Sequence, residues 1–345
     1  MSTAFVYAPA LAHTRRNHPE NHQRLAQLLP TLEQFGVLPA LTAVNPQSAT
    51  LEQLARVHTA EYIDKVREVA HRGGGVLDHG DTYVTPESYQ LARLAAGGTI
   101  AAVDAMMAGA VQNGIVLVRP PGHHAEADRA GGFCLFNNVA FAARHAQTVY
   151  GLKRVLVIDF DVHHGNGTQH IFYEDNTVFF ASVHMFAPYY FYPGIGSSHE
   201  MGEGNGHGYT LNVPLPPHVG DTGYTQIFQE LVWPKATAFR PELIVVSAGF
   251  DAHWQDPLAA EGLSLTGYAR VTQLLMQMAQ DLCNGRILFV LEGGYQQTAL
   301  TYGILNTIYA LLGRDEIHDP LGPMPTPEHD VTDILRQLRQ RHLIY

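Results

Sequence analysis

Five short runs of apolar residues, rich in β-branched side chains, recur along this chain, and helix-like segments separate them. The runs cover residues 115–118, 155–158, 178–181, 243–246 and 287–291. A run without polar alternation is typical of a strand that is buried on both faces of a sheet. Strands that alternate with helices predict an α/β protein with a mostly parallel sheet.

The remaining segments indicate helices and a single domain. Apolar residues at helical spacing predict helices near residues 21–35, 51–70, 86–109, 138–149, 223–238, 266–284 and 296–313, and a further strand is expected within residues 1–10. No internal repeat, linker or shift in composition marks a boundary, so residues 1–345 are expected to form one domain.

Composition excludes several classes of protein. The net charge is −11, from 32 acidic against 21 basic residues without a Lys or Arg cluster, so we expect no nucleic-acid partner. No stretch approaches about 18 unbroken apolar residues, and we therefore expect a cytoplasmic protein without a membrane span. Cys134 and Cys283 are too far apart for a CxxC zinc site, so a metal would need His, Asp or Glu ligands.

Ionisable or glycine-flanked residues follow each of the five apolar runs. In an open parallel sheet, ligands bind beyond the carboxyl ends of the strands, so these residues are expected to meet at one edge. In chain order they are His123 and His124, then Asp159, Asp161 and His163, then Ser182, Val183 and His184, then Asp251, and finally Glu292 and Tyr295. One or two such endings could arise by chance, whereas five indicate a functional site.

Three of these residues form a candidate metal site. Asp161, His163 and Asp251 supply two carboxylates and one imidazole. Three protein ligands leave one coordination position open for water or substrate, which distinguishes a catalytic zinc site from a structural one. The sequence therefore predicts a catalytic metal at the ends of two strands.

The other polar residues suit proton transfer near such a metal. His123 and His124 are candidates for general acid–base work near neutral pH. Tyr295, on a Gly-Gly turn, can donate a hydrogen bond to an oxyanion. Asp159 and Asn166 could orient the imidazoles and set their tautomers. Together these residues predict metal-assisted hydrolysis of a carbonyl compound, and the absence of a GxSxG motif disfavours a nucleophilic serine.

Five motifs resemble those of the histone deacetylase family. They are RPPGHHA (119–125), GGFCLFNN (131–138), DFDVHHGNG (159–167), SAGFDAH (247–253) and LEGGY (291–295). Within the family they look like the class II and bacterial branch that includes acetylpolyamine amidohydrolases, and the similarity runs from about His18 to past Tyr295. The resemblance implies an arginase-like, three-layer α/β fold with a central, mostly parallel eight-stranded sheet, one zinc ion and structural potassium.

Carried over to this chain, the resemblance implies a role for each site residue. The implied zinc ligands are Asp161, His163 and Asp251, and the implied catalytic residues are His123, His124, Tyr295, Asp159 and Asn166. In the implied mechanism, a proton from the attacking water passes to the histidine pair, most directly to His124, and then to the leaving amine. Tyr295 helps to hold the oxyanion, and the products are acetate and a free amine.

The resemblance also implies residues that hold substrate and potassium. The substrate-binding set is Phe133, Tyr192, Asp81, Gly132 and Leu258. Phe133 and Tyr192 would be walls of the acyl-lysine tunnel, and Tyr192 stands where the family usually has phenylalanine. One potassium site would use Asp159, Asp161, His163, Ser182 and Val183, and a second would use Phe172, Asp175, Val178 and Tyr209.

Several interpretations of function stay open. An apolar Leu258, where polyamine deacetylases of the eukaryotic type carry a glutamate, favours an acyl-lysine peptide or protein over an acetylpolyamine. An acetylpolyamine deacetylase remains the alternative, because the loop 184–208 or contacts within a homo-oligomer could narrow the entrance. A non-catalytic acyl-lysine-binding protein would be expected to lack Tyr295 or a zinc ligand. Gly165 and His253, where arginase-like relatives carry aspartates, disfavour a dinuclear metal site.

Overall fold

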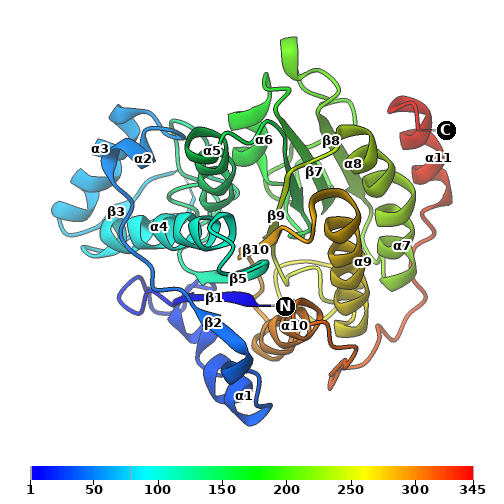
Figure 1. Cartoon of the computed structure of the whole chain (residues 1–345), viewed down its shortest axis with the longest axis horizontal. Coiled ribbons are helices and arrows are strands. Elements are labelled where there is room, and N and C mark those ends of the chain that lie inside the picture. The colour runs from blue at the N-terminus through cyan, green and yellow to red at the C-terminus, as the bar shows by residue number, and fades with distance from the viewer. Residues whose placement is uncertain (1, 79, 345) are drawn as a thin grey trace.

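The computed structural model describes residues 2–78 and 80–344, and it has a central sheet covered by helices on both faces (Figure 1). The sheet order is β2-β1-β5-β10-β9-β6-β7-β8, and every pairing between neighbouring strands is parallel. In chain order these strands are β1 (Thr3–Ala8), β2 (Leu41–Ala43), β5 (Asn113–Val118), β6 (Val155–Asp159), β7 (Val178–Met185), β8 (Thr210–Leu215), β9 (Leu243–Ala248) and β10 (Ile287–Leu291). The predicted arginase-like α/β fold is therefore confirmed. A separate antiparallel pair joins β3 (Gly75–Val76) and β4 (Tyr83–Val84).

The helices divide between the two faces of the sheet. On one face lie α2 (Leu51–Leu54), α3 (Ala60–His71), α4 (Ser88–Met107), α5 (Asn138–Tyr150) and α6 (Asn166–Phe172). On the other lie α1 (Leu28–Gln34), α7 (Asp221–Ile227), α8 (Trp233–Phe239), α9 (Leu265–Cys283), α10 (Gln297–Leu311) and α11 (Thr332–Arg341). A π-helical turn joins α7 to α8. No helix of the described residues is long and apolar enough to cross a membrane.

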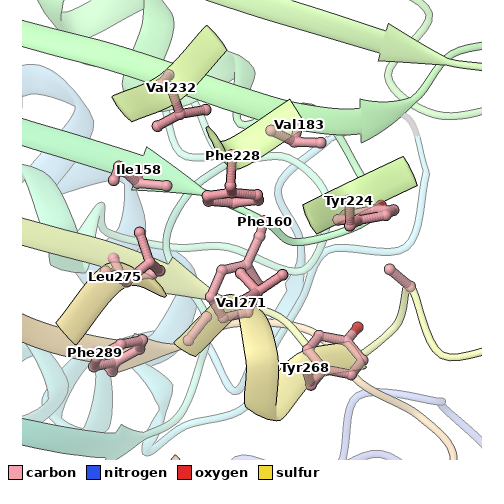
Figure 2. Close-up of a cluster of buried hydrophobic side chains, with 14 of the residues drawn as sticks. Ile158, Phe160, Val183, Tyr224, Phe228, Val232, Tyr268, Val271, Leu275 and Phe289 are labelled. Carbon is pink, nitrogen blue, oxygen red and sulfur yellow. The ribbon is translucent and has the colours of Figure 1, made fainter. Parts of the chain in front are cut away.

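Side chains of the central strands point alternately into two hydrophobic cores. On β6, Leu156 and Ile158 enter the core beneath α7–α10, whereas Val155 and Val157 enter the core beneath α3–α5. Figure 2 shows part of the first core, in which the labelled side chains are Ile158, Phe160, Val183, Tyr224, Phe228, Val232, Tyr268, Val271, Leu275 and Phe289. Burying each large apolar side chain contributes roughly 1.5–3 kcal/mol. The strands whose ends carry the polar residues are therefore held firmly from both sides.

The structure differs from the sequence prediction at several elements. The helix expected over residues 51–70 is two helices, because Thr50 and Thr59 each cap a new N-terminus by accepting a backbone N–H three residues further on. The sequence prediction missed β2, β8, α6 and α11. In β8, Pro214 argues against a central strand, but β8 is the edge strand of the sheet, where proline is tolerated.

Candidate metal centre and active site

The three predicted metal ligands converge at the ends of two adjacent strands. Asp161 and His163 follow β6, Asp251 follows β9, and these strands pair directly. One candidate ligand atom from each residue lies within 4.8 Å of those of the other two. His163 Nδ1 is 3.1 Å from Asp161 Oδ1 and 3.3 Å from Asp251 Oδ2. This geometry allows a single cation to bind all three side chains.

The surroundings of this cluster fit a metal ion. Asp161 and Asp251 are completely buried, and Asp251 Oδ2 has no hydrogen-bond partner among the described residues. Burial and the adjacent charge of Asp161 raise the pKa of Asp251, so two ionised carboxylates here need a cation to balance them. The Gly293 N–H donates to Asp161 Oδ2 at 2.8 Å, and a Cβ on Gly293 would overlap Asp251. Two carboxylates and one imidazole are ligand types that zinc accepts.

The histidine pair lies beside this cluster, and each imidazole has its own polar partner. The rings of His123 and His124 are 3.9 Å apart between centroids, and both line the same cavity as His163. His123 Nδ1 is 3.0 Å from Asp159 Oδ2, and His124 Nδ1 is 2.7 Å from Asn166 Oδ1. Asp159 and Asn166, which the sequence predicts to orient the imidazoles, thus each contact one histidine of the pair.

The environments of the two histidines push their proton affinities apart. Burial lowers the pKa of His123, but the carboxylates of Asp159 and Asp161 outweigh burial and raise it to about 10. Burial and the neighbouring charges of His123 and His163 lower the pKa of His124 well below its ordinary value. In the protein without a metal, His123 is therefore the protonated member and His124 the neutral one.

Tyr295 lies on the turn after β10 and is fixed from two sides. Its backbone N–H donates to Asp256 Oδ2 at 2.8 Å, and the guanidinium of Arg24 lies 4.9 Å from the centre of its ring. Arg24 also donates to the carbonyl oxygens of Glu292 (2.7 Å) and Gly294 (2.8 Å). Burial raises the pKa of the Tyr295 phenol well above its ordinary value, so the hydroxyl keeps its proton and remains a donor.

The polar residues lie at the base of a cavity of about 580 Å³ with aromatic walls. All five predicted substrate-binding residues, Phe133, Tyr192, Asp81, Gly132 and Leu258, line it. Phe133 packs edge-on against Tyr295, with 6.1 Å between ring centroids, and Tyr192 packs edge-on against His124 at 4.8 Å. Asp81 and Leu258 are partly exposed at its rim. Gly132 has φ +52°, and a Cβ there would overlap the ring of His124, so this position requires glycine.

The predicted potassium residues divide into two groups. Asp159 and Ser182 are register partners on β6 and β7, and Asp161, His163 and Val183 lie close by in the chain, so the first set gathers beside the metal ligands. Phe172 ends α6, Val178 begins β7 and Tyr209 precedes β8, which places the second set with Asp175 at the opposite end of the strands.

Sequence reasoning missed three residues that contact the site. Phe191 stacks on His163, Arg24 lies over Tyr295, and Glu126 hydrogen-bonds to Asn166. Phe191 adjoins the predicted Tyr192 and Glu126 follows the motif that ends at residue 125, whereas Arg24 lies outside all five motifs. None of the three has a residue type or spacing that indicates its contact. His199 and His207 are exposed and lie outside the site. His184 is buried on β7, where its ring nitrogens lie 2.9 Å from Ser182 Oγ and 2.9 Å from the Gly196 carbonyl oxygen.

A parallel α/β sheet whose strand ends gather two carboxylates, an imidazole and a histidine pair defines a metal-dependent hydrolase. Comparison with known protein families identifies the family: the model of the histone deacetylase domain matches residues 18–311. The chain therefore belongs to the histone deacetylase family, which is zinc-dependent, and it is a deacetylase, a hydrolase of amide bonds.

Individual relatives agree with this assignment. The chain is 38% identical over 360 residues to histone deacetylase 14, chloroplastic, of Arabidopsis thaliana, covering 99% of this chain and 84% of that protein. It is 40% identical over 314 residues to the histone deacetylase-like amidohydrolase of Pseudomonas aeruginosa (91% and 81% covered) and 40% identical over 341 residues to polyamine deacetylase HDAC10 of Homo sapiens (95% and 50% covered). The crystal structure of the HDA15 HD domain matches with a TM-score of 0.90 and 38% identity, covering 99% of this chain and 96% of that one.

Proposed function

We propose that residues 1–345 act as a single deacetylase domain that binds one zinc ion through Asp161, His163 and Asp251 and removes acetyl groups from N-ε-acyl-lysine or a similar acylated amine. The observation that supports this most strongly is the position of the three ligands beneath a histidine pair, at the base of a cavity with aromatic walls. When bound there, zinc supplies Lewis acidity that polarises a carbonyl group and activates water.

The side chains around the cluster provide the proton transfers. His124 Nδ1 donates to Asn166, which leaves Nε2 with a free lone pair, so His124 can accept the proton of the attacking water and pass it to the leaving amine. His123 is paired with Asp159, which favours its protonated form, and a protonated His123 adds positive charge beside the reacting carbonyl. The Tyr295 hydroxyl donates to the oxygen that becomes negative as water attacks.

The cavity walls favour an acyl group on a flexible chain. Phe133 and Tyr192 are aromatic walls against which an aliphatic linker can pack, and the acylated end would then reach the metal ligands. Leu258, at the rim, offers no charge to a second ammonium group. These features support an acyl-lysine in a peptide or protein. The named polyamine deacetylase among the relatives supports acetylpolyamine as the second candidate.

The experiment that tests this assignment is a comparison of kcat/KM for the zinc-loaded protein across four substrates: acetyl-lysine peptide, trifluoroacetyl-lysine peptide, acetylputrescine and acetylspermidine. A preference of tenfold or more for the peptides, about 1.4 kcal/mol of transition-state binding, would support the acyl-lysine assignment. The opposite preference would identify a polyamine deacetylase. Absence of turnover on all four substrates would contradict the proposed deacetylase substrate class.

We further propose that potassium binds at the first predicted set of residues, since Asp159 and Ser182 stand side by side on β6 and β7 and offer oxygen ligands. The second set, Phe172, Asp175, Val178 and Tyr209, would bind through backbone carbonyl oxygens. We also propose that the protein forms a homo-oligomer, and a sedimentation experiment that measures its mass in solution would test this.

A further inference from the structure

We propose that Glu126 is a positioning residue that sets the tautomer of His124 by fixing the orientation of the Asn166 side-chain amide. The proposal rests on the role proposed above for His124 as the group that accepts a proton. It concerns a residue behind the histidine pair that touches neither substrate nor metal ligand. Glu126 directly follows the motif RPPGHHA (119–125) and belongs to none of the five motifs.

Three buried side chains form a continuous hydrogen-bonded chain. His124 Nδ1 is 2.7 Å from Asn166 Oδ1, and Asn166 Nδ2 donates to Glu126 Oε1 at 3.0 Å. His124, Asn166 and Glu126 are only 4%, 8% and 5% exposed. Solvent therefore cannot readily replace either contact, and each of these polar groups depends on its protein partner.

The orientation of the Asn166 amide decides which nitrogen of His124 carries the proton. A neutral imidazole has one N–H donor and one lone-pair acceptor. With Oδ1 facing His124, Nδ1 must donate, and Nε2 keeps the lone pair that can accept a proton. If the amide turned by 180°, its N–H would face Nδ1 and would require Nδ1 to accept. Nε2 would then carry the hydrogen and could not act as a base.

The shape of the Asn166 amide does not favour either orientation, because its oxygen and nitrogen exchange nearly the same positions when the amide turns. Its hydrogen-bond partners therefore decide the orientation. An ionised carboxylate makes the choice, since it accepts hydrogen bonds and cannot donate them. Glu126 therefore holds the N–H side of Asn166 and directs the oxygen toward His124. An aspartate at position 166 would need no such partner, because both of its oxygens accept.

The side chains of Arg129 and His170 lie at the other side of the Glu126 carboxylate. Arg129 Nη2 lies 2.6 Å from Glu126 Oε2, and His170 Nε2 lies 3.7 Å from the same oxygen. The backbone also fixes the residue, because the Glu126 N–H donates to the Arg129 carbonyl at 2.9 Å and the Glu126 carbonyl accepts from His58 Nδ1 at 2.9 Å. Oε1 is thus presented to Asn166 by a rigid loop.

A double-mutant cycle tests the proposal. Glutamine at position 126 can donate or accept, so Glu126→Gln should let the Asn166 amide adopt both orientations. The competent fraction of His124, and with it kcat/KM, should fall by about twofold or more. In an Asn166→Asp background the same Glu126→Gln change should not lower kcat/KM, because the symmetric carboxylate no longer needs orienting. An equal loss in both backgrounds would overturn the proposal.

The tautomer can be measured without catalysis. In ¹⁵N-histidine NMR spectra, the His124 signal, assigned by its absence from His124→Ala, should show Nδ1–H in the wild type and a substantial Nε2–H population in Glu126→Gln. An unchanged tautomer in Glu126→Gln would contradict the proposal, whatever the activity. This readout is independent of the catalytic role of His124, which fails separately if His124→Ala keeps full turnover.

Two further variants separate amide orientation from folding and local charge. Glu126→Asp keeps a carboxylate that can only accept hydrogen bonds, so it should retain the Nδ1–H tautomer of His124. If Glu126→Gln does not fold, the tautomer is measured in Glu126→Asp instead. A changed tautomer in Glu126→Asp would count against the proposal. The matched control is His170→Gln, at the far side of the same carboxylate and 51% exposed. A loss in His170→Gln as large as that in Glu126→Gln would show that a general disturbance around the carboxylate, and not amide orientation, is responsible.

Discussion

The ring of Phe191 lies flat on the ring of His163, with centroids 4.8 Å apart and planes 7° from parallel. His163 is a proposed zinc ligand and is the only one of the three that is partly exposed, at 12% of its side chain. The stack therefore covers the open face of the imidazole and limits its rotation. An ordered imidazole loses less conformational entropy when it binds a metal.

We expect Phe191→Leu to weaken zinc binding. Loss of the stacked pair removes about 0.5–1.5 kcal/mol, which corresponds to an increase in Kd for zinc of roughly two- to tenfold. Competition with a fluorescent chelator at pH 7.5 measures the Kd. The control is Tyr189→Leu in the same loop, whose side chain is 98% exposed and whose Kd should not change. Equal Kd values for Phe191→Leu and the wild type would remove Phe191 from the support of the metal site.

We expect Gly293→Ala to lose zinc almost as completely as Asp251→Ala. A Cβ at Gly293 would overlap Asp251 Oδ2 and lie 2.6 Å from Asp161 Oδ2, so it would push the two carboxylates out of position. Zinc per chain after gel filtration, measured by elemental analysis, should be close to zero in both variants. Gly75→Ala is the control, because a Cβ there meets only the Val69 side chain at 3.3 Å. A zinc-replete Asp251→Ala protein would exclude Asp251 from the ligand set.

We expect Tyr295→Phe and His124→Ala to lower turnover while zinc content stays near that of the wild type. Tyr295→Phe removes one donor to the oxyanion, which typically costs about 10²–10³-fold in kcat. His124→Ala removes the proton acceptor, which costs about 10²–10⁴-fold. Steady-state kinetics and elemental analysis on the same samples check both quantities. Wild-type turnover in either variant, with zinc bound, would disprove the role assigned to that residue.

Most of the fold and much of the site could be predicted from the sequence, because both depend on local patterns. Asp161, His163 and Asp251 follow apolar strands, and parallel strands bring their carboxyl ends to one edge whatever the loops do. The sequence prediction missed the helix break at Thr59 and the edge strand β8. Whether a threonine caps a helix, and whether a proline is tolerated in a strand, depends on where the residue lies in the folded protein.

Contacts made across loops could not be predicted in the same way. Phe191 adjoins the predicted Tyr192, yet only the folded loop shows that Phe191 covers His163 while Tyr192 packs edge-on against His124. Glu126 follows the histidine pair by two residues, but its contact with Asn166 joins segments 40 residues apart. Side-chain partners of this kind depend on packing between distant segments and leave no periodic signal.

His58 should make the stability of the protein fall as the pH is lowered. It is 3% exposed, its Nδ1 donates to the Glu126 carbonyl at 2.9 Å, and its Nε2 accepts the Asn137 N–H at 3.0 Å. Burial lowers its pKa from 6.5 to about 4, although the backbone hydrogen bond to the Glu126 carbonyl favours the charged form. Protonation of Nε2 would also place an N–H against the Asn137 N–H. The neutral form is thus favoured in the folded state.

Between pH 6.5 and pH 4 the unfolded chain therefore binds more protons at His58 than the folded one, so this contribution to stability is present above pH 6.5 and is lost as the pH falls toward 4. From pH 7 to pH 5 the loss from His58 alone is about 2 kcal/mol. Urea unfolding of zinc-loaded protein at both pH values measures it. His58→Gln, whose amide can both donate and accept, should show a drop in unfolding free energy that is smaller by about that amount. Equal drops in wild type and variant would show that His58 does not titrate between these pH values.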